Sequence, residues 1–176
     1  AVIRVSFPLQ DYTGVSGNGD FLYPVKPIEC GDYTIDPPPH DRHYFQSHVI
    51  AVDNYYRSVS YGKFGIDLQN SNVFPLENES SYLINTSMNY YNEISYDDFH
   101  EKRITELLRD AVTQAYEADN IDFSQFDLIT VIHPGVGQDF QLPFLDPSPE
   151  DIPSTYVDKI MVSTHLGGPI KVGSGS

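Results

Sequence analysis

The residue best placed for chemistry in this sequence is His133, which follows the apolar run 128–132 and precedes Pro134 and Gly135. A short run rich in β-branched side chains, with no polar alternation, is typical of a strand buried on both faces, as in a parallel sheet. The carboxyl ends of such strands border the crevice in which open α/β sheets bind ligands. We therefore expect His133, with Asp139 shortly after it, to line a cleft. The alternative is a purely structural histidine, which is the commoner role at a strand end.

The number and spacing of cysteines and histidines give little support for a zinc site. Cys30 is the only cysteine, so a cysteine-based zinc site cannot form within the chain. His100-Glu101 begins like a His-Glu-x-x-His helix, but Ile104 stands where the second imidazole is needed. Three further histidines lie close in the sequence at a spacing that matches one helical face poorly: His40, His43 and His48. We expect no zinc site in this chain.

Carboxylates in the proline- and glycine-rich loops suit a hard cation better. Calcium takes oxygen ligands, and the segments 11–36 and 139–158 are rich in them, although no EF-hand spacing is present. Solvated acidic loops are the simpler interpretation. The candidate calcium ligands are Asp11, Asp20, Asp32, Asp36, Asp139 and Asp146.

Composition and missing motifs exclude several classes of function. Ten Lys and Arg against 25 Asp and Glu give a formal charge of −15, which argues against nucleic acid or an anionic membrane as partner. No apolar stretch is long enough to span a membrane. Phosphate-binding, dinucleotide-binding and nucleophile-elbow motifs are missing. An unrelated serine hydrolase stays open as a weaker reading, because the order of a triad in sequence is not fixed.

The composition also bears on domain count and compartment. The 176 residues, 40% of them hydrophobic, are enough for one domain, which we expect over 1–166, followed by a flexible Gly/Ser-rich tail over 167–176. Many Tyr, Pro, Asn and Ser and few Lys favour a secreted or cell-surface protein, and no signal peptide is expected at Ala1. Two triplets match the N-glycosylation pattern, at Asn78 and Asn85, and matter only in a glycosylating host.

Hydrophobic periodicity predicts an α/β fold: a mainly parallel sheet with helices packed on it and long Pro/Gly-rich loops. The clearest helical face comprises Ile104, Leu107, Leu108, Ala111, Val112 and Ala115; a second comprises Phe45, Val49, Val52, Tyr56 and Val59. The expected elements are a strand over 1–7, a helix over 41–59 capped by Asp41, strands over 63–68 and 72–76, a loop over 77–96, a helix over 97–117, and strands over 128–132 and within 156–163. This order indicates a βαβαβ unit with right-handed crossovers.

Three segments together resemble the N-terminal half of the catalytic domain of M6 metallopeptidases, the immune inhibitor A family. Residues 2–11 (VIRVSFPLQD) resemble the family's first strand with Phe-Pro and an acidic residue. Residues 52–64 (VDNYYRSVSYGKF) are similar to its helix end, where Tyr-Tyr precedes Ser-x-Gly-Lys. Residues 121–135, from IDFSQFD to VIHPG, are similar to its Asp-Phe-Ser element before a strand ending in Ile-His-x-Gly. The similarity covers residues 1–137.

The resemblance implies a βαβαβ scaffold whose sheet forms the upper wall of a peptide-binding cleft. The family's zinc helix lies downstream of this region, and no zinc ligand or catalytic glutamate maps onto this chain. Whether the chain belongs to an enzyme is therefore open. The chain is expected to be the N-terminal scaffold portion of a secreted zinc metallopeptidase, inactive alone, with the rest of the domain as partner and zinc present only with that part. The alternative is a non-catalytic extracellular structural or binding module on the same scaffold, for instance a repeating subunit.

Overall fold

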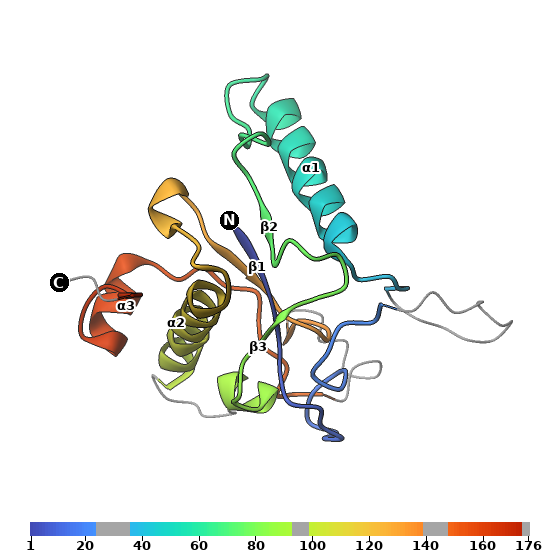
Figure 1. Cartoon of the computed structure of the whole chain (residues 1–176), viewed down its shortest axis with the longest axis vertical. Coiled ribbons are helices and arrows are strands. Elements are labelled where there is room, and N and C mark those ends of the chain that lie inside the picture. The colour runs from blue at the N-terminus through green and yellow to red at the C-terminus, as the bar shows by residue number, and fades with distance from the viewer. Residues whose placement is uncertain (24–35, 93–98, 139–147, 174–176) are drawn as a thin grey trace, which may run out of the picture.

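The computed structural model describes residues 1–23, 36–92, 99–138 and 148–173, which form an α/β fold with a small parallel sheet (Figure 1). Fold class and parallel sheet are thus as the sequence predicted. In chain order the elements are β1 (Val2–Ser6), α1 (Arg42–Val59), β2 (Val73–Phe74), β3 (Tyr82–Leu83), the 3₁₀ helix η1 (Met88–Asn92), α2 (Phe99–Asp119), the 3₁₀ helix η2 (Phe123–Gln125), β4 (Thr130–Ile132) and α3 (Lys159–Leu166).

The central strand is β1, not the run 128–132. β1 pairs in parallel with β2 and β3 along one edge and with β4 along the other. Ile3 and Val5 of β1 expose no surface, whereas Leu128 is 62% exposed and Thr130 is exposed as well. The expectation that 128–132 is buried on both faces holds only in part: Val131 and Ile132 pack partly buried against the two cores, whereas Leu128 and Thr130 are exposed.

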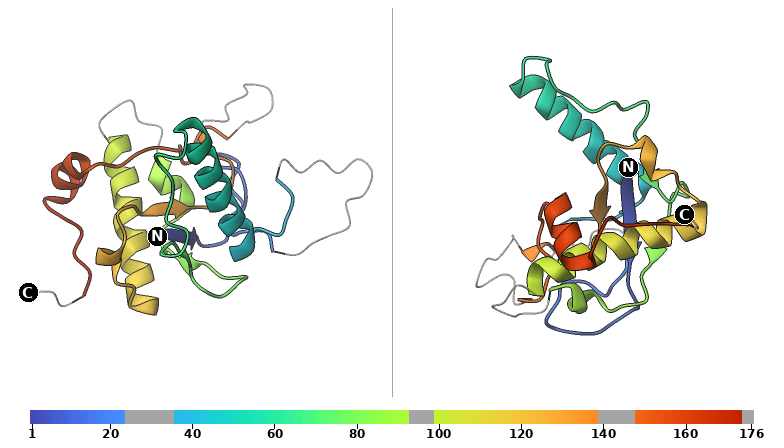
Figure 2. Two further views of the ribbon diagram at one scale, coloured as in Figure 1. Left: turned by 90° about the horizontal axis from the view of Figure 1, so that it is seen from above. Right: turned by 90° about the vertical axis from the view of Figure 1, so that its left-hand side faces the viewer.

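Side chains of β1 alternate between two cores, one on each face of the sheet. Ile3 and Val5 belong to the larger core, together with Leu107 of α2. Val2 packs on the opposite face against the smaller core, which contains Phe45 of α1. Figure 2 (left) shows the resulting order of layers: α3, α2, the sheet and α1.

The helix α2 has the buried face that its periodicity predicted. Ile104, Leu107, Ala111, Val112 and Ala115 are all buried, and Leu108 is partly buried beside them. Such a stripe of side chains at helical spacing is what an amphipathic helix packs against a sheet. The predicted first residues of this helix, 97 and 98, lie outside the described residues.

The helix α1 begins as predicted, but its apolar stripe is not buried as predicted. Asp41 caps its first turn by accepting a hydrogen bond from Tyr44 N. Phe45 in the first turns is buried, whereas Tyr56 and Val59 in the last turns are exposed. The distal half of α1 stands clear of the sheet (Figures 1 and 2).

Two predicted strands are not strands. Residues 63–68 form a loop because Asp53 of α1 accepts the Ile66 N–H and Arg57 donates to the Ile66 carbonyl, so side chains take the place of a ladder. The apolar run within 156–163 lies in the helix α3, since Asp158 accepts from two backbone N–H groups at its start and Gly167 ends it with φ of 74°. The expected loop 77–96 contains β3 and η1.

The loop after β2 is fixed by a buried arginine. Arg4 of β1 is fully buried, and its guanidinium donates to the carbonyls of Pro75, Glu77 and Asn78 at 2.6–2.7 Å. Asn78 in turn donates from Nδ2 to Asp41 Oδ2 at 2.7 Å. The interior of the sheet is thereby connected to the N-terminus of α1.

Part of the segment expected to be a flexible tail is packed: Ile170 and Val172 lie partly buried against the larger core.

Of the described helices, none combines the length and the apolar character that crossing a membrane requires.

Candidate functional site

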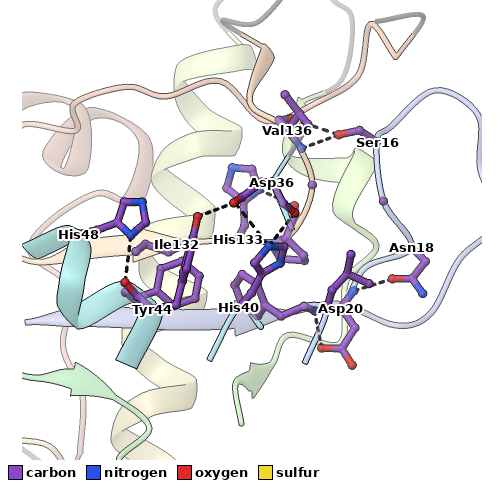
Figure 3. Close-up of a pocket in the computed structure, with 16 residues that line it drawn as sticks. Ser16, Asn18, Asp20, Asp36, His40, Tyr44, His48, Ile132, His133 and Val136 are labelled. Carbon is purple, nitrogen blue, oxygen red and sulfur yellow. Dashed lines mark hydrogen bonds and ion pairs between the residues drawn. The ribbon is translucent and has the colours of Figure 1, made fainter. Parts of the chain in front are cut away.

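A cavity of about 760 Å³ opens at the carboxyl ends of β1 and β4 (Figure 3). Parallel strands place the loops that follow them at one edge of the sheet, which is where α/β folds bind ligands. The start of α1 closes the third side. The cavity is lined by residues 16–18 and 20–22 after β1, by Asp36, His40, Tyr44, Phe45 and His48 around the start of α1, and by residues 132–136 at the end of β4.

His133 lies in the wall of this cavity, at the strand end predicted from the sequence. Its Nδ1 lies 2.9 Å from the Pro134 carbonyl oxygen. Burial lowers the pKa of His133, although Pro134, Asp151 and the Ile152 backbone favour the protonated ring. A neutral imidazole at this position can hydrogen-bond a ligand without adding positive charge.

The α1 side of the cavity is an aromatic stack. The Tyr44 ring lies between the rings of His40 and His48, at centroid distances of 5.2 and 4.4 Å. Tyr44 donates its hydroxyl proton to Asp36 Oδ2 at 2.5 Å, and His40 Nε2 lies 3.5 Å from the same oxygen. Burial and the Asp36 carboxylate raise the pKa of Tyr44, so the hydroxyl stays protonated. His43 does not line the cavity, and its side chain is 75% exposed.

A buried carboxylate, Asp151, holds the rim between the β1 and β4 loops. Its Oδ1 accepts from Ser16 N at 2.6 Å and from Ser16 Oγ at 2.9 Å, and its Oδ2 accepts from Ser148 Oγ. Ser16 Oγ also accepts the Val136 N–H at 2.6 Å. The loops touch so closely that a Cβ on Gly135, where φ is 88°, would lie 2.5 Å from the Ser16 carbonyl oxygen.

The proposed calcium ligands are only partly brought together. Asp20 and Asp36 both line the cavity, whereas Asp11 is exposed and does not. Asp20 Oδ1 accepts the N–H of Phe21, and Asp36 is held by Tyr44 and His40. The other candidates, Asp32, Asp139 and Asp146, lie outside the described residues. Within the described ranges no three His, Cys, Asp or Glu side chains are grouped so as to hold a metal ion.

A second hollow, of about 700 Å³, runs beside β4 on its other face, between residues 126–133 and 152–157. Both hollows are lined by Ile132, His133 and Gly135, so they adjoin at the end of β4. Ile132 belongs to the smaller core and Val131 to the larger one, as alternating side chains of a strand require. The strand therefore separates two hollows that share its end.

Sequence reasoning named His133, Asp20 and Asp36, which all line the cavity, but it missed Ser16 and Asp151. Asp151 looked like one carboxylate in an acidic, proline-rich loop, and Ser16 like one serine among many. His40 and His48 were noticed, but His40 precedes α1, so helical spacing could not show that the two rings flank Tyr44. Long-range partners such as Ser16 and Asp151 leave no signal in a single sequence.

Comparison with known proteins adds no relative: no family model matches the chain, and neither the curated proteins nor the solved structures contain a significant match.

Proposed function

We propose that this chain binds extended peptide along the outer edge of β4, as the N-terminal, non-catalytic part of a secreted M6-like zinc metallopeptidase. The observation that carries the proposal is the outer edge of β4, which pairs with no other strand among the described residues and lies between two adjoining hollows. The sequence resemblance supports the family, and the strand edge supports peptide as the ligand, because an extended peptide can add to an exposed sheet edge.

The register of β4 determines which backbone groups are available. Thr130 N donates to Ala1 O at 2.9 Å, and the pairs Thr130–Val2 and Ile132–Arg4 belong to the parallel ladder with β1. Successive residues in a strand turn their backbone groups to opposite sides, so the N–H and C=O of Val131 point away from β1. No described residue forms a backbone hydrogen bond with them. A peptide strand can pair there.

The hollows indicate which peptides fit. Successive side chains of an added strand alternate between the faces of the sheet and would enter the two hollows in turn. Apolar side chains such as Phe21, Phe45 and Ile132 line the first hollow, together with Asp20 and Asp36. The described residues lining either hollow include carboxylates but no Lys or Arg. We therefore expect apolar and basic peptide side chains to be preferred over acidic ones.

Zinc does not fit the residues described. The chain offers no group of three ligands there, so no catalytic step is assigned to its own side chains. The proposed hydrolysis belongs to sequence beyond residue 176, and the role of this chain is to bind and orient the substrate.

The binding proposal is tested with Val131→Pro. Proline removes the outward N–H while the inward groups of Thr130 and Ile132 keep their bonds to β1. Binding of a fluorescent peptide with alternating apolar and basic residues should be lost in Val131→Pro and kept in the control Val131→Ala. Equal binding by both variants, each folded by circular dichroism, would refute the strand-edge site.

The family assignment is tested separately. This chain alone should hydrolyse no protein substrate and should retain no stoichiometric zinc after dialysis. A longer chain of the same protein should carry a His-Glu-x-x-His motif within the next hundred residues or so, bind one zinc and hydrolyse peptide. One zinc per chain in this segment, or a continuation without the motif, would contradict the assignment and leave the peptide-binding result unaffected.

Calcium is the ion we propose for the acidic loops, since carboxylate oxygens suit a hard cation. Of the described candidates Asp11, Asp20 and Asp36, the last two line the first hollow. Millimolar calcium should raise the thermal midpoint, whereas the same concentration of magnesium should have less effect. Identical midpoints with and without calcium would count against the proposal.

A second candidate function, an extracellular structural or binding module, is favoured by the exposed apolar side chains of α1. It requires no downstream zinc helix. It predicts a protein partner for α1 and no peptidase activity in the longer chain.

A further inference from the structure

The loop after β1 contains an Asn-Gly pair, Asn18-Gly19, in the wall of the candidate cavity (Figure 3). Asn18 is exposed and lines the cavity. The backbone of the pair is held by two hydrogen bonds: Gln10 N donates to the Asn18 carbonyl at 2.9 Å and Phe7 N to the Gly19 carbonyl at 2.7 Å. The pair therefore has a defined conformation beside the end of β1.

The fold requires glycine at position 19. Its φ is 98°, and a Cβ there would lie 2.8 Å from the Pro8 carbonyl oxygen and 3.2 Å from that of Phe7. Only glycine adopts this backbone conformation without strain. A residue without a side chain also leaves its backbone nitrogen open to approach from the preceding side chain. The fold thus places an unhindered nitrogen next to the Asn18 amide.

The Asn18 side chain is folded back toward that nitrogen. Its Oδ1 accepts the Asp20 N–H at 3.2 Å, the contact that defines an Asx turn (Figure 3). A bond between the Gly19 nitrogen and Asn18 Cγ would close a succinimide, a small ring without strain. Among the described residues none accepts a hydrogen bond from the Gly19 N–H. The Gly19 nitrogen is therefore available as a nucleophile.

Two of the contacts around the pair favour this ring closure. The Asp20 N–H polarises the side-chain carbonyl of Asn18 and would stabilise the oxyanion that forms when Cγ is attacked. The Gln10 N–H withdraws electron density from the peptide group between Asn18 and Gly19, which makes the Gly19 N–H more acidic. The same loop conformation activates both the electrophile and the nucleophile.

We propose that Asn18 is a site of deamidation in the folded protein. The Gly19 nitrogen gives its proton to hydroxide and attacks Asn18 Cγ, and the tetrahedral intermediate expels Nδ2 as ammonia to leave the succinimide. Water then opens the ring at either carbonyl, which gives aspartate or isoaspartate at position 18. The net reaction consumes one water and releases one ammonia, so no enzyme or further reactant is needed.

Both products change the cavity. Each adds a carboxylate to its wall beside Asp20. Isoaspartate also inserts one carbon into the backbone between the Cα of residue 18 and the Gly19 nitrogen, so the acceptors of Gln10 and Phe7 cannot both keep their positions. The proposal does not depend on peptide binding at β4.

Peptide mapping by mass spectrometry during incubation of the whole chain at mildly alkaline pH tests the proposal. Asn70 is the internal control, because it is exposed but its Nδ2 donates to Asp67 Oδ2 at 2.7 Å. Unfolding in guanidinium chloride removes both sets of contacts. Asn18 should then react about two- to tenfold more slowly than in the folded chain, the effect of losing one or two hydrogen bonds. Asn70, released from Asp67, should react faster.

The opposite response of the two asparagines separates promotion by the fold from the susceptibility of any Asn-Gly pair. An Asn18 that keeps its amide in the folded chain, or that reacts faster once unfolded, would overturn the proposal. Asn18→Gln should not convert, because its longer side chain would need a larger ring, and conversion at that position would exclude the succinimide route.

Thermal unfolding tests the effect on the loop. Asn18→Asp retains an acceptor for the Asp20 N–H and should melt like wild type, whereas the isoaspartate fraction, separated by chromatography from aged wild type, should melt at a lower temperature. An isoaspartate fraction that melts like Asn18→Asp would refute the proposed effect of the inserted carbon.

Discussion

Ser16 and Asp151 lie 135 residues apart in the sequence and are joined by two hydrogen bonds, from the Ser16 backbone N–H and from its hydroxyl to Asp151 Oδ1. This contact fixes the loop after β1 to the segment that follows β4. The wall of the candidate cavity that contains His133 depends on it.

Replacing Asp151 by Ala should destabilise the protein by about 2–3 kcal/mol, because buried donors of Ser16 and Ser148 lose their acceptor. Asp151→Asn keeps one carbonyl oxygen and should cost less. Urea unfolding of both variants checks the order, with the exposed Asp11→Ala as control. If Asp151→Ala and Asp11→Ala are equally mild, Asp151 does not hold the rim.

Leu107→Ala should cost about 2–5 kcal/mol, as for other buried large-to-small changes, since Leu107 is buried between α2 and the sheet. Arg109→Ala should cost under ~1 kcal/mol, because its pair with Asp110 is partly exposed. Chemical denaturation measures both. A greater loss for Arg109→Ala would mean that α2 presents the opposite face.

Stability should fall as the pH drops below about 6.5, the usual pKa of an unfolded histidine. Burial lowers the pKa of His133 in the folded protein, so the unfolded chain takes up the proton first, and the loss is complete once the pH is below the folded pKa. The slope of unfolding free energy against pH between 5 and 7 should be smaller in His133→Gln. His43→Gln, at an exposed position, is the matched control, and an equal change there would contradict the assignment to His133.

In a glycosylating host, Asn85 should carry a glycan and Asn78 should not. Asn85 is exposed, whereas Asn78 Nδ2 is bonded to Asp41, the N-cap of α1. A glycan on Asn78 would displace that bond. Mass spectrometry of the secreted protein should show one occupied site, which Asn85→Gln removes. Occupancy of Asn78 in folded protein would show that this hydrogen bond is dispensable.

Local patterns in the sequence were enough to predict α1 and α2. The spacing from Ile104 to Ala115 marks one face of a helix, and Asp41 is a capping residue directly before another, so neighbouring residues alone specify both. The strand end at His133 was equally visible, because Pro134 and Gly135 cannot continue a ladder. These features depend on interactions within a few residues.

Tertiary structure decided what no local pattern contains. The runs that form β1 and β4 look alike in the sequence, and only the pairing of strands makes Ile3 central and leaves Val131 at an edge. The run within 156–163 is too short for its period to separate strand from helix. The stripe from Val52 to Val59 has the pattern of a buried face, yet the described chain places no element against it. Burial depends on which distant segments meet, as Ser16 and Asp151 do, and the sequence of neighbours does not specify that.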